Sequence, residues 1–246
     1  SMDHENPLDG VIDRSLNYGR HHIDHFLAVA NHDSPKIFLD IGAGWGTDLL
    51  LARSHNPSAQ LHAIELSAEY KKGLHQKGIT VHSLNIERDV FPFADESVDV
   101  LIANQILEHV KEIFWIFHES TRVLRVGGTF IIGVPNLASL HNRLLLAVGQ
   151  QPTCLQNHSA HVRGFTKSDI LRFLSVCFPR GYHLRKFGGS NFYPFPGFIA
   201  KPLAVILPNL AWGIFLMLRK DRAYAKEFLV HPATHRLETN FHLGNE

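Results

Sequence analysis

Residues 36–46, with the sequence KIFLDIGAGWG, join a short apolar run to a glycine-rich turn. A continuous apolar run of this length is typical of a strand that is buried on both faces of a parallel sheet. Glycines directly after such a strand let the backbone turn tightly and approach a ligand without side-chain obstruction. The stretch therefore predicts a strand, a ligand-binding turn and a helix that follows from residue 47.

Further along the chain, short apolar runs alternate with helical stretches, which is the pattern of βαβ units and a parallel sheet. The sequence thus predicts an α/β fold. Strands are expected at 36–41, 60–65, 80–84, 98–104, 129–134, 182–187 and 212–218, and helices at 15–30, 47–55, 68–77, 111–124, 137–148 and 168–178.

Composition narrows the class of protein. The chain of 246 residues is 45% hydrophobic and 19% charged, as globular proteins are. It has two cysteines, which form no disulfide framework, and its N-terminus lacks a charged-then-apolar signal, so we expect a cytoplasmic protein.

Charge is unevenly distributed along the chain. Residues 1–140 carry 11 Lys and Arg against 18 Asp and Glu, whereas residues 141–246 carry 13 against 5. The basic C-terminal part either faces an anionic substrate or surface, or reflects ordinary surface variation. A dense basic stripe interleaved with aromatic residues is missing, so nucleic-acid binding is not expected.

The apolar stretch 197–218 has nearly the length of a transmembrane helix. Lys201, Pro202 and Pro208 interrupt it, and Pro208 with Asn209 favours a turn. A short helix followed by a buried strand is therefore predicted, while peripheral membrane contact stays open.

The glycine turn and Glu65 together indicate a nucleoside ligand. The turn has the spacing GxGxG, and Asp48 follows it where a carboxylate would disfavour a phosphate on the helix N-terminus. S-adenosylmethionine (SAM) has no phosphate and a positive sulfonium, so acidic neighbours suit it. Glu65, at the end of the second strand, can accept hydrogen bonds from both ribose hydroxyls.

Four motifs in order, DIGAGWG, AIEL, LNIERDVFPFADESVDVLIANQILEHV and RVLRVGGTFIIGVPN, give a more specific result. In sequence and spacing they resemble the class I SAM-dependent methyltransferase family over about residues 36–136, and residues 165–174 are also similar to it. The resemblance implies a Rossmann-like, doubly wound, seven-stranded sheet, mostly parallel with the last strand antiparallel, and a helical lid inserted after strand five.

The same resemblance implies a cofactor site for SAM. Asp40 would neighbour the methionine amino group, Glu65 the ribose and Asn85 the adenine edge, where relatives often have Asp. The full set of implied cofactor-binding residues is Tyr18, Arg20, Asp40, Gly42, Ala43, Gly44, Glu65, Leu66, Asn85, Ile86, Glu87, Asn104 and Gln105.

We expect one domain, divided along the chain by role. A helical cap (1–34) precedes the SAM-binding core (35–136), the lid (137–165), the C-terminal part of the sheet (166–220) and a tail (221–246) in which we find no motif.

Three histidines are candidates for a catalytic base, which is needed only if the acceptor must lose a proton. His109 follows the fourth strand, and His158 and His161 lie in the lid loop. The H-x-x-H spacing lacks a nearby cysteine or a repeated pair, so no metal site is predicted.

The lid also resembles methyltransferases encoded among bacterial polysaccharide and lipid biosynthesis enzymes. With the basic C-terminal part, this favours a small-molecule acceptor that is anionic or linked to a lipid or saccharide. An NAD-dependent oxidoreductase and a non-catalytic SAM-fold binding protein remain alternatives. The sequence does not give the oligomeric state.

Overall fold

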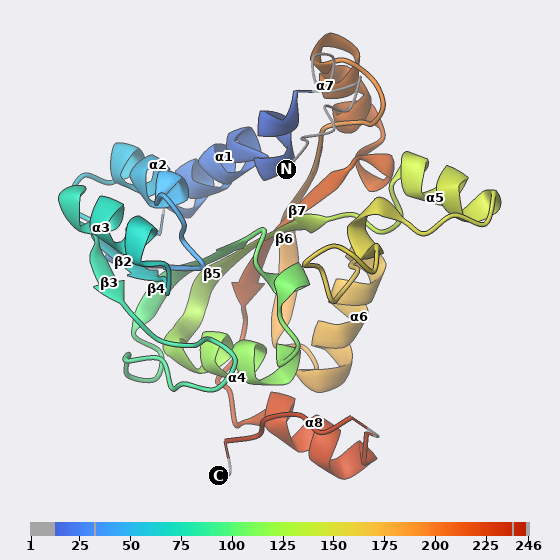
Figure 1. The fold of residues 1–246 in the computed structure, drawn as a ribbon. Coiled ribbons are helices and arrows are strands. Elements are labelled where there is room, and N and C mark those ends of the chain that lie inside the picture. The colour runs from blue at the N-terminus through green and yellow to red at the C-terminus, as the bar shows by residue number, and fades with distance from the viewer. Residues whose placement is uncertain (1–12, 32, 238, 245–246) are drawn as a thin grey trace.

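A computed structural model describes residues 13–31, 33–237 and 239–244. Within these ranges the chain forms one seven-stranded sheet in the order β3-β2-β1-β4-β5-β7-β6, with β7 antiparallel to both of its neighbours (Figure 1). The strands are β1 (Ile37–Ile41), β2 (Gln60–Ile64), β3 (Thr80–His82), β4 (Val98–Asn104), β5 (Leu124–Pro135), β6 (Tyr182–Ser190) and β7 (Gly213–Lys220).

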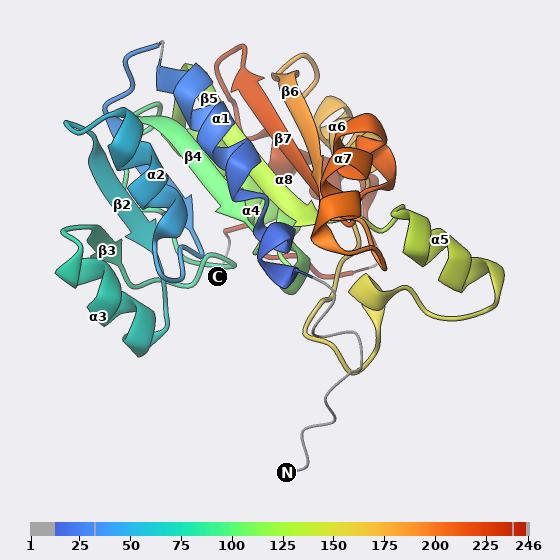
Figure 2. The same ribbon diagram turned by 90° about the horizontal axis from the view of Figure 1, so that it is seen from above.

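Helices cover both faces of the sheet (Figure 2). They are α1 (Arg20–Asn31), α2 (Thr47–His55), α3 (Ala68–Gln76), α4 (Ile113–Val123), α5 (Leu140–Ala147), α6 (Lys167–Cys177), α7 (Gly197–Ile206) and α8 (Glu227–His235). Short 3-10 turns are η1 (Arg14–Tyr18), η2 (Leu107–His109), η3 (Thr153–Leu155) and η4 (Pro208–Leu210). The predicted Rossmann-like class, strand number and reversed last strand are confirmed.

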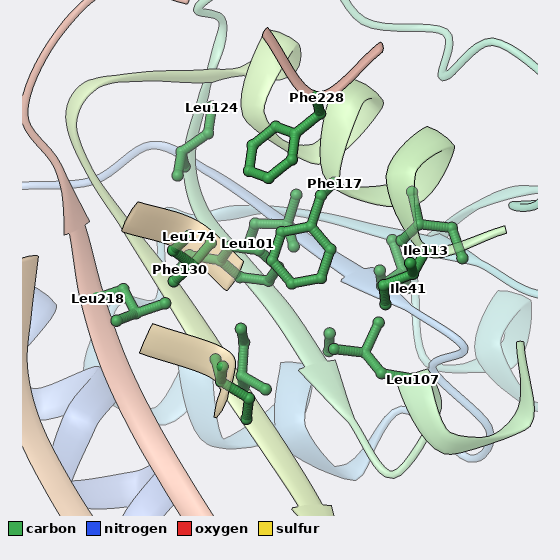
Figure 3. Packing of buried hydrophobic residues seen from close by; sticks show 14 of the residues in the cluster. Ile41, Leu101, Leu107, Ile113, Phe117, Leu124, Phe130, Leu174, Leu218 and Phe228 are labelled. Carbon is green, nitrogen blue, oxygen red and sulfur yellow. The ribbon is translucent and has the colours of Figure 1, made fainter. Parts of the chain in front are cut away.

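Alternate residues of the central strands enter two separate cores. Leu101 and Phe130 face α4, α6 and α8, while Val100 and Ile131 face α1, α2 and α3. In the first core, Phe117 of α4 lies between the sheet and Phe228 of α8 (Figure 3). Since helices bury both faces of the sheet, its central strands can meet solvent only at their ends.

The predicted leading helix at 15–30 is divided in two. Gly19 has φ +52°, which ends η1 before α1 begins, and a Cβ added there would lie 2.1 Å from the Phe215 ring. This close approach to β7 requires glycine. Residues 1–12 of the predicted cap lie outside the described residues.

Two further differences concern the C-terminal half of the chain. The fifth strand, predicted at 129–134, begins already at Leu124, and Gly127 and Gly128 form an irregularity inside it, because Val98 pairs with Leu124 and Val100 with Thr129. The tail at 221–246, in which we found no motif, contains α8. Its Phe228 is fully buried, so this segment completes one helical layer.

The stretch 197–218 forms α7, η4 and β7, as predicted. In the described ranges, no helix has the length and apolar character needed to cross a bilayer.

Asp99 ties the start of β1 to β4 and β5. Its Oδ2 accepts hydrogen bonds from the backbone N–H groups of Lys36 and Ile37, both at 2.9 Å, and its Oδ1 accepts one from Arg125 Nε at 2.5 Å. Burial by itself would raise the pKa of Asp99. The two backbone donors and Arg125 outweigh it and lower this pKa below its ordinary value.

Asp99→Asn should lower the free energy of unfolding by about 1–3 kcal/mol at pH 7, since the variant loses charge-assisted bonds. The folded-state pKa is depressed, so this stabilisation is present above the unfolded-state pKa of about 3.9 and is lost as the pH falls through the folded-state value. Urea unfolding at pH 7 and pH 3 should show the difference shrinking in acid. Asp95→Asn, at an exposed partner of Arg122, is the control. A loss of unfolding free energy in Asp99→Asn that is equal at pH 7 and pH 3 would contradict this account.

Candidate functional site

A cavity of about 650 Å³ opens at the carboxyl ends of β1, β2 and β4, where the strand order reverses between β1 and β4. Ligands of open α/β sheets bind at this switch point. The structure brings all of the predicted cofactor residues into the lining of this one cavity: Tyr18, Arg20, Asp40, Gly42, Ala43, Gly44, Glu65, Leu66, Asn85, Ile86, Glu87, Asn104 and Gln105.

The glycine turn after β1 forms the floor of the cavity. Gly42 and Gly44 have φ of +71° and +51°, conformations that favour glycine. A Cβ at Gly42 would lie 2.7 Å from the Ile106 side chain, whereas one at Gly44 would meet nothing within 4 Å. Glycine at position 42 thus allows Ile106 to pack against the turn, and glycine at position 44 leaves the turn open on the side where its Cβ would lie.

Two backbone N–H groups hold the Glu65 carboxylate in place. Its Oε2 accepts a hydrogen bond from Gly44 N at 2.9 Å, and its Oε1 accepts one from Ser67 N at 2.8 Å. Each carboxylate oxygen keeps a free lone pair. The carboxylate is therefore oriented before any ligand arrives.

Asn104, at the end of β4, joins three elements around the cavity. Its Nδ2 donates to Asp48 Oδ2 in α2 at 2.8 Å and to the Tyr18 carbonyl at 3.1 Å. Arg20 Nε lies 3.8 Å from the other oxygen of Asp48, and the Arg20 guanidinium stacks 4.5 Å from the centre of the Tyr18 ring. The N-terminal segment is thereby fixed over the end of the sheet.

Three carboxylates give the cavity an acidic character. Burial raises the pKa of Asp40 well above its ordinary value, and the neighbouring charges of Asp48 and Glu65 raise it further. Burial also raises the pKa of Asp48, although the Asn104 hydrogen bond and Arg20 oppose the rise. A cationic ligand group would relieve this crowding, whereas a phosphate would add to it.

Several buried polar atoms at the cavity have no hydrogen-bond partner within the described residues. They are Arg20 Nε, Asp48 Oδ1, Asn104 Oδ1 and Gln105 Nε2. Gln105 also has φ +57°, unusual for a residue with a side chain. Because unpaired buried polar groups are costly, these atoms mark a site that a polar ligand completes.

The predicted adenine side is partly engaged by the protein itself. Asn85 Oδ1 accepts from Glu87 N at 2.9 Å, and Glu87 Oε1 accepts from the N–H groups of Lys111 and Glu112 at 2.7 and 3.0 Å. Leu66 remains 57% exposed, which offers an apolar surface to a planar group.

The structure brings two of the three predicted histidines together and leaves the third apart. His109 lines the cavity, and its ring lies 4.7 Å from that of His161, centre to centre. Next to them, the buried carboxyl of Glu108 has its pKa raised to about 7 by burial. His158 is exposed and lies outside the cavity lining.

Sequence reasoning left Asp48, Trp45 and Tyr70 out of the site, although all three line the cavity. Asp48 had a usable signal, an acid in the first turn of the helix after the glycines. Trp45 lies in the glycine turn and Tyr70 in α3, and an aromatic side chain at such a position does not by itself indicate a ligand.

Comparison with known proteins agrees with this geometry. A family model described as a methyltransferase domain matches residues 39–132. A 37.1 kDa uncharacterized protein in transposon TN4556 of Streptomyces fradiae is 32% identical over 106 residues, covering 42% of this chain and 31% of that protein. The malonyl-[acyl-carrier protein] O-methyltransferase of Herminiimonas arsenicoxydans is 31% identical over 103 residues, covering 42% and 38%.

Among solved structures, the plantazolicin methyltransferase BpumL in complex with S-adenosylhomocysteine (SAH) has the same fold, with a TM-score of 0.57 at 18% identity. That match covers 85% of this chain and 86% of BpumL. The match to the two curated relatives, in contrast, spans only 31% and 38% of their length.

The sheet order, the glycine turn and the matched domain define a class I methyltransferase fold with its nucleoside cleft. The part of the chain that matches the methyltransferase-domain model, residues 39–132, contains the glycine turn, Glu65 and Asn104 of this cleft.

Proposed function

We propose that this protein transfers a methyl group from SAM to a small-molecule acceptor that carries a lipid-like part. One observation supports the cofactor above all: the acidic cavity with unpaired polar atoms from Arg20, Asp48, Asn104 and Gln105. SAM has a cationic sulfonium, an ammonium, a carboxylate and a ribose, which are the groups that such a set of donors and acceptors complements.

The chain's own residues would bind and orient the cofactor. Asp40 and Asp48 attract its positive end, Arg20 pairs with its carboxylate, and Glu65 accepts from the ribose hydroxyls through its remaining lone pairs. Leu66 and Ile86 cover the base. SAM supplies an activated methyl group, so the protein's main contribution is positioning and exclusion of water.

The same cavity disfavours NAD. Asp48 lies in the first turn of α2, where a pyrophosphate would otherwise sit, and its carboxylate is buried. A phosphate there would be placed against this carboxylate and would compete with it for Arg20, the cation that lies 3.8 Å from Asp48.

A second cavity of about 500 Å³ supports an acceptor with an apolar part. It lies between the start of α1, the end of β6 and α7, and most of its lining is apolar, including Leu16, Ala204 and Val205. Arg20 lines both cavities, so the two adjoin at this residue. An apolar chain held there would bring its head group towards the cofactor cavity.

Exposed apolar side chains gather on α5 and α7, which project from the same end of the molecule, opposite α3 (Figures 1 and 2). Phe198 is 79% exposed and Val205 72%, and Leu144 and Val148 are also exposed. Large exposed apolar side chains of this kind mark interaction surfaces. With Lys201 between them on α7, they suit an anionic lipid surface, and the segment 137–165 would then act as a lid on the acceptor side.

The arginines of that lid segment differ in availability. Arg163 donates to the carbonyls of Val110 and Lys111 and so holds the loop, whereas Arg143 donates to Ala138 O and is otherwise exposed. Of the two, Arg143 is the one we propose to meet an anionic acceptor. Of the three candidate histidines, His109 is the one we place nearest to the reacting atoms.

Calorimetric titration should give micromolar binding of SAH and none of NAD or NADP. Glu65→Ala should weaken SAH binding by about 10-fold or more, because the ribose loses its carboxylate acceptor. Glu69→Ala removes an exposed acid in α3 and is the matched control, which should bind SAH as the unchanged protein does. Binding of NAD, or equal effects of the two variants, would contradict the proposed cofactor.

SAH binding should weaken as the pH is lowered from 8 to 5. Because burial raises the pKa of both Asp40 and Asp48, these carboxyls take up protons at a higher pH than ordinary aspartates do, and a neutral carboxyl attracts the ligand's ammonium less. Calorimetry at several pH values measures the slope. Asp40→Asn should bind about 10-fold more weakly at pH 8 and vary less with pH. Constant affinity in the unchanged protein would exclude this role.

The double variant Phe198→Asp, Val205→Asp should bind anionic phosphatidylglycerol vesicles at least about 10-fold more weakly than the unchanged protein, because each side chain contributes roughly 1.5–3 kcal/mol on burial. Co-sedimentation measures the effect. Val90→Asp and Val176→Asp, at exposed valines elsewhere, serve as the control pair. No binding by the unchanged protein would remove the lipid-surface part of the proposal.

A further inference from the structure

The lid loop brings a third ligand to the pair Glu108 and His109. One potential ligand atom from each of Glu108, His109 and His161 lies within 4.8 Å of the others. Two donors bound to one ion at about 2.1 Å are about 3.4 Å apart in a tetrahedral site, so the three ligand atoms need to approach one another by at most about 1.4 Å when the ion binds. From these residues we infer a binding site for a divalent transition-metal ion at the rim of the cofactor cavity.

Both imidazoles are already oriented as metal ligands require. His109 Nδ1 lies 3.4 Å from the Ala160 carbonyl, and His161 Nδ1 lies 3.2 Å from the Cys154 carbonyl. A carbonyl only accepts, so each Nδ1 is the protonated nitrogen and each Nε2 keeps its lone pair. Backbone carbonyls that hold ligand histidines in this tautomer are a usual outer shell of metal sites.

Glu108 supplies the independent sign of a ligand. Its side chain is only 2% exposed, and its Oε2 is buried without a hydrogen-bond partner among the described residues. Its Oε1 lies 3.9 Å from His109 Nε2, too far for a hydrogen bond. A buried carboxylate oxygen left without a donor is costly, and a bound cation would satisfy it.

The two chain segments that carry the ligands are fastened together. Val162 N and Arg163 N both donate to the Glu108 carbonyl, at 2.8 and 3.2 Å. The Arg163 guanidinium also donates to the carbonyls of Val110 and Lys111. His161 is therefore held beside Glu108 and His109 by backbone contacts, and not by a chance side-chain orientation.

The donor set identifies the class of ion. Two imidazoles and one carboxylate suit Zn²⁺, Fe²⁺ or Mn²⁺, whereas Ca²⁺ and Mg²⁺ take oxygen ligands. Three protein ligands leave coordination positions free, as in catalytic metal sites. Since His109 also lines the cavity, an ion here would bind an acceptor oxygen and lower its pKa, a role that rests on the proposed function.

The sequence predicts no metal site, because there His161 is considered together with His158. The structure instead places His161 beside Glu108 and His109, 53 and 52 positions earlier, and His158 is not a member of this cluster.

The test is Co²⁺ titration of the full chain, stripped with a chelator, followed by its visible d–d absorption and by calorimetry with Zn²⁺. His161→Ala and Glu108→Gln should each lower affinity by about 100-fold or more and abolish the tetrahedral Co²⁺ spectrum. His158→Ala, in the same loop, is the matched control and should retain both. Other histidine pairs, such as His62 with His82, stay intact in every variant, so the difference reports on this site.

Circular dichroism and urea unfolding check that each variant folds, and His161→Asn serves if His161→Ala does not. An unchanged Co²⁺ spectrum in folded His161→Ala, or equal loss in His158→Ala, would overturn the inference. SAH titration of the same samples separates the two proposals. Metal binding without SAH binding would support the metal site and contradict SAM as the cofactor. SAH binding without metal binding would contradict only the metal site.

Discussion

The cofactor cavity depends on the side-chain amide of Asn104. From the end of β4 it binds Asp48 in α2 and the backbone carbonyl of Tyr18, so one residue joins the sheet, the helix after the glycine turn and the N-terminal segment. Gly133 of the neighbouring strand β5 leaves room for the Asn104 side chain, since a Cβ at this position would lie only 2.3 Å from Asn104 Oδ1.

The acidic character of the cavity follows from the same construction. A parallel sheet covered on both faces brings polar side chains together where its strands end. Asp40 and Glu65 lie at the ends of adjacent strands, and the short glycine turn brings Asp48 beside them. Such crowding is tolerated at a site whose ligand carries the missing positive charge, and this is the property of SAM that distinguishes it from a dinucleotide.

The second half of the chain surrounds the acceptor side. The loop after α5 returns to Glu108 and brings His161 to the rim. α5 and α7 lie on the side of the molecule opposite α3 (Figure 2), and both carry exposed apolar side chains. One cavity opens to the cofactor and the adjoining one to α7, with Arg20 in both linings. The proposed cofactor and acceptor would thus approach from different sides and meet near Arg20.

The fold class, most of the strands and the residues that gather in one cavity could be predicted from the sequence, since local periodicity and the glycine turn act over short stretches of chain. α2 and β4 fall where expected, and every predicted cofactor residue lines one cavity. The sequence missed the break at Gly19, which is caused by Phe215, and the helix α8, whose buried face meets α4. Only tertiary structure decided that His161 lies beside Glu108 and His109 while His158 does not, because that contact depends on how a long loop returns to the sheet, and no local pattern records it.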